Sequence, residues 1–123
     1  MEEYLLLGDI STEEWEVKQF LGSVNDVQFN NIAYQAVPNV MLVSRSIGMM
    51  LSAFSIPDGA VHTSQEIYNF GVARFGDVVQ CYSKKEKERI IGGMKLFGVS
   101  CKFYKGKGNI LCESRSIVIV KNI

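Results

Sequence analysis

The chain has 123 residues, of which 47% are hydrophobic, 21% are charged and 2 are proline. These values exclude a disordered or collagen-like chain and predict a single compact domain over residues 1–123 with a substantial core. The formal net charge is zero, but residues 1–40 hold seven acidic residues and one lysine, whereas residues 80–123 hold ten Lys or Arg and three Glu.

Several absences narrow the class of protein further. No apolar run approaches the roughly 20 residues of a membrane span, and the start Met1-Glu2-Glu3 is acidic where a secretory leader is basic. The three cysteines lack C-x-x-C spacing and there is one histidine. We therefore expect a cytoplasmic protein with reduced thiols, no metal, no cofactor and no membrane partner.

The first third of the chain predicts a strand followed by a helix. Residues 4–7 form a short apolar run before Gly8-Asp9, which is typical of a buried strand. Ser11 to Glu14 then reads as a capping box, in which the Ser11 oxygen accepts from the Glu14 amide and the carboxylate reaches back. A helical face follows, with Gly22 as the predicted stop; its members are Val17, Phe20, Leu21 and Val24.

The centre of the sequence is ambiguous between helix and strand. Residues 27–37 predict a strand that ends at Pro38. Residues 39–54 fit a helical face, but the run at 40–43 also suits a strand, and Pro57-Asp58-Gly59 favours a turn between two strands. On balance we predict strands in this region.

Two helices and a hairpin are expected in the remainder. Capping boxes at Thr63–Glu66 and Ser83–Glu86 predict helices over 63–75 and 83–97, with a strand at 77–82 between them. A hairpin of residues 99–105 and 110–120 closes the chain around a glycine-rich turn. The predicted fold class is α+β, a mostly antiparallel sheet with three helices packed on one side and a C-terminal β-hairpin.

Basic side chains in the last third are candidate ligand-binding groups. Lys84 and Lys85 would lie in the first turn of a predicted helix, where the dipole disfavours cations, and Arg89 would share their face. Lys105 and Lys107 flank the hairpin turn, with aromatic residues interleaved. The alternative is a solvent-exposed charged face and a protected edge strand.

The tetrapeptide Ser-Arg-Ser-Ile occurs twice, at 44–47 and at 114–117. An arginine flanked by hydroxyls suits a phosphate group, because its planar fork of donors matches two oxygens. Arg45 and Ser46 could therefore meet Arg115 and Ser116 on one anion, although four common residues also recur by chance. No nucleophile elbow, phosphate-binding loop or zinc-protease motif is present, so we predict no catalytic residue.

These patterns lead to three readings of function. The first is a small non-enzymatic binding or regulatory protein that sequesters an anionic, phosphate-bearing ligand such as a nucleotide, or that docks on a partner protein. The second is a nucleic-acid-binding module that uses residues 84–107, and the third is a small enzyme with a Cys or His catalytic group. Opposite-sign regions and a mean hydropathy of +0.09 also lead us to expect a homodimer.

Overall fold

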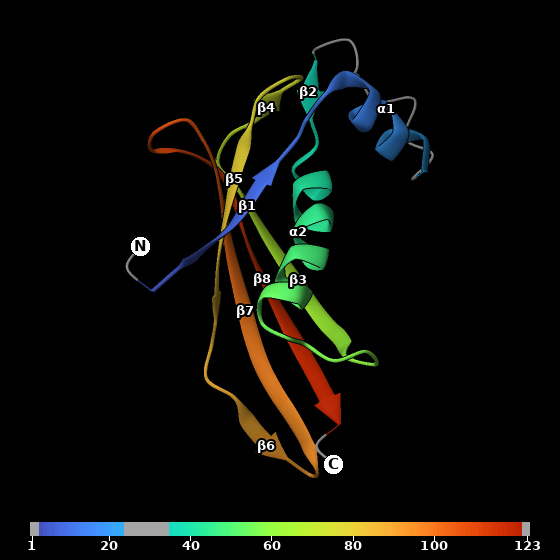
Figure 1. Ribbon diagram of the computed structural model, residues 1–123, viewed down its shortest axis with the longest axis vertical. Coiled ribbons are helices and arrows are strands. Elements are labelled where there is room, and N and C mark those ends of the chain that lie inside the picture. Colours follow the sequence, from blue (N-terminus) through green and yellow to red (C-terminus); the bar gives the residue numbers. More distant parts are fainter. Residues whose placement is uncertain (1–2, 24–34, 122–123) are drawn as a thin grey trace.

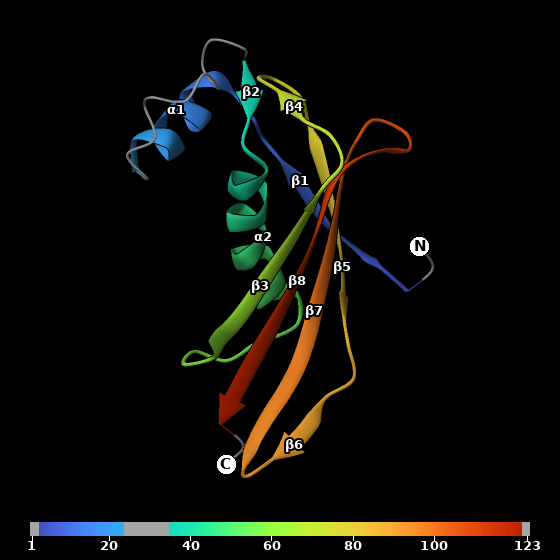
Figure 2. The same ribbon diagram turned by 180° about the vertical axis from the view of Figure 1, so that it is seen from behind.

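The computed structural model describes residues 3–23 and 35–121 of the chain. A long antiparallel sheet curves around one central helix, and Figures 1 and 2 show that helix on a single face of the sheet. The elements in chain order are β1 (Leu5–Ile10), α1 (Glu14–Ser23), β2 (Ala36–Val37), α2 (Asn39–Ala53), β3 (Val61–Asn69), β4 (Ala73–Arg74), β5 (Val79–Lys85), β6 (Arg89–Ile91), β7 (Met94–Lys105) and β8 (Asn109–Lys121).

The strands of the main sheet follow the order β1-β5-β7-β8-β3, and β6 pairs with the start of β7. All of these pairs are antiparallel, and β7 and β8 form the longest of them. A separate two-stranded sheet joins β2 to β4 close to the start of α2. The outer edge of β3 therefore has no strand partner among the residues that the structure describes.

The core lies between α2 and the concave face of the sheet. Met41, Leu42 and Met50 of α2 are almost fully buried, as are Phe103 of β7 and Val118 of β8. Side chains of a strand alternate between the two faces, so every second residue of β8 points toward the helix. The remaining side chains of these strands form an outer face that α2 does not cover.

Residues 39–53 form a helix, so the prediction of strands here is wrong. Apolar side chains recur at helical spacing, and a 15-residue helix buries Met41, Leu42, Val43 and Met50 against the sheet. Pro38 has extended backbone angles, φ −63° and ψ 130°, and it lies between the end of β2 at Val37 and the start of the helix at Asn39.

The helices predicted over 63–75 and 83–97 are strands instead. Residues 61–69 pair along their length with β8, and this pairing outweighs the local capping signal at Thr63. In the second region, Gly92 and Gly93 have φ of 57° and 79° and turn the chain between β6 and β7. Adjacent glycines favour such a hairpin turn. The predicted helix over 83–97 would run through this turn and is therefore interrupted.

Other predictions are confirmed. The strand near residues 4–7 is the beginning of β1, the following helix is α1, and the C-terminal hairpin is β7 and β8. The predicted capping box at Ser11–Glu14 is displaced by two residues, because α1 begins at Glu14 and the Glu13 amide donates to Glu16 Oε2 at 3.3 Å. The strand predicted over 27–37 lies largely outside the described residues, apart from β2.

The antiparallel α+β class is thus confirmed, but the described part of the chain contains two helices rather than three. Neither of these helices is long and apolar enough to cross a membrane.

Candidate functional site

The first turn of α2 carries no side-chain cap. The residue before the helix is Pro38, which has no hydroxyl or carboxylate to offer to the first amides, and no acidic residue lies in the first turn. The Met41 amide donates to the Pro38 carbonyl at 2.9 Å. Because the first amides of a helix lack partners within it, this positive end of the dipole suits a partly negative oxygen.

The side chain of Asn39 ties this helix end to the sheet. Its Nδ2 donates to Asn69 Oδ1 and to the Gly71 carbonyl, both at 3.0 Å, and lies 3.5 Å from the Leu111 carbonyl. With its amide nitrogen so engaged, Asn39 Oδ1 is buried and has no hydrogen-bond donor among the described residues. An unpaired buried acceptor costs about 1–3 kcal/mol, so a water or hydroxyl that donates to it would be stabilised there.

Gly71 brings the segment after β3 close to β8. The amides of Phe70 and Gly71 both donate to the Leu111 carbonyl at 2.9 Å. A Cβ at position 71 would lie 3.3 Å from the Ile110 carbonyl oxygen, which is closer than almost all real contacts of that kind. A side chain at position 71 would push the Ile110 backbone away by a few tenths of an ångström, so glycine favours this close approach and the position of the carbonyl that Asn39 binds.

The sequence neighbours of Asn39 and Gly71 include three exposed apolar side chains. Val40 follows Asn39 on the helix and is 56% exposed, while Phe70 and Val72 flank Gly71 and are 59% and 54% exposed. Large apolar side chains gathered on one surface mark a site that binds an apolar ligand or another protein. The candidate site therefore combines an uncapped helix end, one unpaired acceptor and an apolar rim.

The cysteines lie in the core and not at this site. Cys101 is 2% exposed and its thiol donates to Ser83 Oγ at 3.3 Å. The hydrogen bond with Cys81 is the largest cause that lowers the pKa of the Cys101 thiol, and hydrogen bonds with Ser83 and other hydroxyls add to it. The hydrogen bond between the two thiols raises the pKa of Cys81. Burial raises the pKa of Cys112 to about 12. Burial keeps all three thiols from reagents in solution, and the raised pKa values of Cys81 and Cys112 also disfavour their thiolate forms.

The single histidine is also remote from the helix start. His62 lies at the beginning of β3, opposite Val118, whereas Asn39 contacts Asn69 at the end of the same strand. His62 Nε2 is buried and has no hydrogen-bond partner among the described residues. A Cys–His catalytic pair at the start of α2 is therefore not formed by the part of the chain that the structure describes.

The structure does not bring the two Ser-Arg-Ser-Ile segments together within one chain. Arg45 is exposed on α2, whereas Arg115 projects from the outer face of β8, between the buried Ser114 and Ser116. The sheet thus separates the two guanidinium groups. Ser46 Oγ donates to the Val43 carbonyl at 2.6 Å, and Ser116 Oγ donates to Gln65 Oε1 at 2.9 Å, so both hydroxyls bind within the protein.

The other basic candidates are spread over the sheet, and three of them pair with carboxylates. Lys84 pairs with Glu3, Lys85 with Glu88, and Lys105 with Asp77. Lys107 lines a cavity of about 540 Å³ with Tyr82 and Tyr104, whose rings meet edge to face at 5.8 Å. Arg89 lies on β6, where it lines a different cavity with Arg115.

Asn39 and Gly71 were not among the residues that the sequence patterns singled out. The order Pro-Asn before a run of helical periodicity was a usable signal for the start of a helix. No sequence pattern linked Asn39 to its partners Asn69 and Gly71. These residues lie 30 or more positions farther along the chain, beyond the reach of a local pattern.

No protein-family model matches this sequence, and no curated protein is detectably similar to it. Solved structures with the same fold are found nevertheless. The C-terminally truncated HadBC complex of Mycobacterium tuberculosis, a (3R)-hydroxyacyl-ACP dehydratase, has a TM-score of 0.77 at 11% identity, with 96% of each chain covered. The (R)-hydratase of A. caviae has a TM-score of 0.74 at 13% identity, with 90% of this chain and 89% of that chain covered. The MaoC-like dehydratase of Rhodospirillum rubrum has a TM-score of 0.76 at 11% identity, with 98% and 91% covered.

This chain therefore has the hot-dog-like fold of the MaoC-like dehydratases. The expectation of a non-enzymatic binding or regulatory protein is wrong, because the similar structures are those of enzymes. The similarities also support neither the nucleic-acid-binding reading nor the reading with a Cys or His catalytic group.

Proposed function

We propose that this chain is a subunit of an enzyme that adds water to, or eliminates it from, an acyl thioester, with the reaction at the start of α2. The similarity to a hydroxyacyl-ACP dehydratase and an (R)-hydratase supports this class of reaction. The observation that carries the proposal is the juxtaposition at Asn39. Its buried, unpaired Oδ1 lies at the uncapped end of a helix, so an acceptor for water and donors for a carbonyl oxygen are adjacent.

The amides at the helix start suit the carbonyl oxygen of the thioester, and Asn39 Oδ1 suits the oxygen of the water. When water adds to a double bond conjugated to a thioester, negative charge develops on the carbonyl oxygen. Amides at a helix start stabilise that charge without reorganisation. Asn39 Oδ1 accepts a hydrogen bond from the attacking water, or from the hydroxyl that leaves in the reverse direction.

Neither group removes a proton, so the reaction also requires a general base. The hydrogen bonds of Asn39 bring no acidic or basic side chain to it within the described residues. Asp26 is the only acidic residue in the sequence between α1 and α2, and it lies outside the described residues. Replacement of Asp26 by Asn, with turnover of the thioester as the readout, tests whether this residue supplies the base.

The free edge of β3 provides a surface for a second subunit. A nine-residue edge strand with one unpaired side is a template for pairing with another chain. We infer that a second copy of this chain pairs there and covers Phe70 and Val72 beside the site; the HadBC dehydratase is likewise a complex. Phe70→Asp should give a monomer in analytical ultracentrifugation, whereas Trp15→Asp on α1, also exposed at 66%, should not. A wild-type monomer at all concentrations would contradict the pairing.

The activity is tested with a crotonyl thioester and with its 3-hydroxybutyryl counterpart. We expect the absorbance of the conjugated thioester to fall on hydration and to rise in the reverse reaction. Asn39→Ala should lower kcat/KM by about 10- to 150-fold, the equivalent of one hydrogen bond to a charged or strongly polarised group. Ser52→Ala, at the exposed far end of α2, is the matched control. Release of free thiol would indicate hydrolysis instead, and no turnover of either thioester would refute the proposal.

A further inference from the structure

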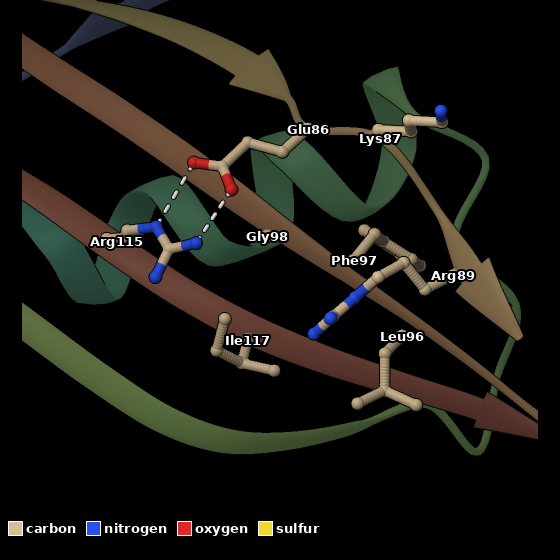
Figure 3. A pocket seen from close by; sticks show the side chains of 8 residues that line it. All are labelled: Glu86, Lys87, Arg89, Leu96, Phe97, Gly98, Arg115 and Ile117. Carbon is tan, nitrogen blue, oxygen red and sulfur yellow. Dashed lines mark hydrogen bonds and ion pairs between the residues drawn. The ribbon is translucent and has the colours of Figure 1, made fainter. Parts of the chain in front are cut away.

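A cavity of about 150 Å³ lies on the outer face of the sheet, the face that α2 does not cover. It forms where β6 folds against β7, above the outward side chains of β7 and β8 (Figure 3). The residues that determine its chemistry are Glu86, Arg89, Leu96, Gly98, Arg115 and Ile117. The candidate site at the start of α2 shares none of these residues.

One wall of the cavity is a fixed ion pair. Arg115 Nε donates to Glu86 Oε1 at 3.1 Å and its Nη2 donates to Oε2 at 2.8 Å, and Ser100 Oγ also donates to Oε1 at 3.0 Å. The carboxylate lies above Gly98, where a Cβ would come within 2.4 Å of Oε2. Arg115 is thus oriented by Glu86, while its Nη1 has no acceptor among the described residues.

The opposite wall carries a second guanidinium group. Arg89 is exposed on β6, and Figure 3 shows its side chain extending across the cavity toward Ile117. It forms no ion pair and no hydrogen bond with any residue in 3–23 or 35–121. Two guanidinium groups and the ammonium group of Lys87, which also lines the cavity, outnumber the one carboxylate. The cavity therefore has a net positive charge, which is complementary to an anion.

The floor between the two arginines is apolar. Leu96 and Ile117 project outward from neighbouring strands and are both partly buried. The volume accommodates an anionic head group with a few carbon atoms, and is well below the roughly 300 Å³ of sites for larger ligands.

We propose that this cavity binds a small aliphatic monocarboxylate, with its head group between Arg89 and Arg115 and its chain on Leu96 and Ile117. The proposal does not depend on the hydratase function, because the two sites lie on opposite faces of the sheet. It gives a shared role to Arg89 and Arg115, which lie on the separate strands β6 and β8.

The test uses amide chemical shifts of the ¹⁵N-labelled full chain during titration with acetate, butyrate, hexanoate and inorganic phosphate. We expect shifts at Gly98 and Ile117, and tighter binding of butyrate than of acetate because of the apolar floor. Arg89→Ala should weaken butyrate binding by about 10- to 150-fold, and Arg89→Lys should restore only part of it. Arg45→Ala removes an exposed arginine on the other face and should leave binding unchanged.

The possible results separate clearly. The proposal is supported if affinity rises with the length of the carboxylate's alkyl chain in the wild type and in Arg45→Ala, and if this dependence is lost in Arg89→Ala. Tighter binding of phosphate than of butyrate would overturn the assignment to a monocarboxylate. An absence of shifts at Gly98 and Ile117, or equal effects of the two alanine variants, would overturn the site itself.

Discussion

Asn39 donates a hydrogen bond to Asn69 Oδ1 at 3.0 Å, and this contact joins the first residue of α2 to the last residue of β3. The same amide group binds the Gly71 carbonyl, so one side chain fixes the start of the central helix against the segment that follows the edge strand. The cost of this arrangement is the unpaired Oδ1, which makes the position suitable for a ligand that donates a hydrogen bond.

Removal of this side chain should lower stability as well as activity. We expect Asn39→Ala to reduce the free energy of unfolding by about 1–3 kcal/mol, because the Gly71 carbonyl and Asn69 lose their donor. Urea denaturation monitored by circular dichroism measures the change, with Ser52→Ala as the control on the same helix. An unchanged midpoint for Asn39→Ala would mean that Asn39 does not anchor the helix.

Two glycines should respond in opposite ways to the same substitution. A Cβ at Gly98 would lie 2.4 Å from Glu86 Oε2 and 3.3 Å from Arg115 Nη2, so Gly98→Ala must displace the ion pair. We expect a small loss of up to about 1 kcal/mol, because the displaced carboxylate is the end of a flexible side chain in a partly exposed ion pair. Gly48 lies within α2 with nothing within 4 Å of the added methyl, so Gly48→Ala should stabilise the fold by about 0.5–1 kcal/mol. Thermal unfolding of both variants tests the contrast.

The effect of Gly98→Ala should depend on Glu86. In a Glu86→Ala background the added methyl no longer meets a carboxylate, so the two substitutions should be less than additive. Strict additivity of the two losses would show that Glu86 is not the group that Gly98 accommodates.

The ion pair also predicts a dependence of stability on pH. The hydrogen bond from Arg115 is the largest cause that holds the pKa of the Glu86 carboxyl below its ordinary value. Because the folded pKa is lower than the unfolded one, the stabilisation is complete above the unfolded pKa and is lost as pH falls through the folded pKa. The difference in Tm between wild type and Glu86→Gln should therefore shrink between about pH 6 and about pH 3.

A surface pair provides the comparison for this experiment. Glu14 lies 3.6 Å from Lys18 on α1, with both side chains at least half exposed, so Glu14→Gln should change Tm little at any pH. A Glu86→Gln variant that behaved like Glu14→Gln throughout the range would contradict a stabilising role for the Glu86–Arg115 pair.

The cysteines should be unreactive in the folded protein. Cys81, Cys101 and Cys112 are all buried, at 0%, 2% and 0% exposure. We expect a thiol reagent such as dithionitrobenzoate to modify none of them under native conditions and all three after denaturation in guanidinium chloride. Rapid modification of one thiol in the native protein would revive the possibility of a catalytic cysteine.

The sequence alone was sufficient where local signals and tertiary pairing agree. The first strand, α1 and the C-terminal hairpin were predicted, because a capping pattern, an apolar face and a glycine-rich turn each act over a few residues. Glycines 106 and 108 have φ of 60° and 76°, which is the conformation that the hairpin turn needs.

Local signals did not decide residues 39–53, 61–69 and 83–97. Each of these segments contains apolar residues at spacings that suit both a helix and a strand, and the outcome depends on what each one packs against. Val61–Asn69 is a strand because β8 offers a partner along its length, and Asn39–Ala53 is a helix because its buried face packs on one face of the sheet.

The candidate site depends on the tertiary structure for the same reason. Asn39 meets Asn69 and Gly71 only after β3 has paired with β8, and Glu86 meets Arg115 only across the intervening strand β7. The sequence by itself determined the antiparallel class, the first helix and the final hairpin, since those rest on contacts between near neighbours. The central helix and both arrangements of polar side chains were decided by contacts between residues about 30 to about 70 positions apart, which no local pattern encodes.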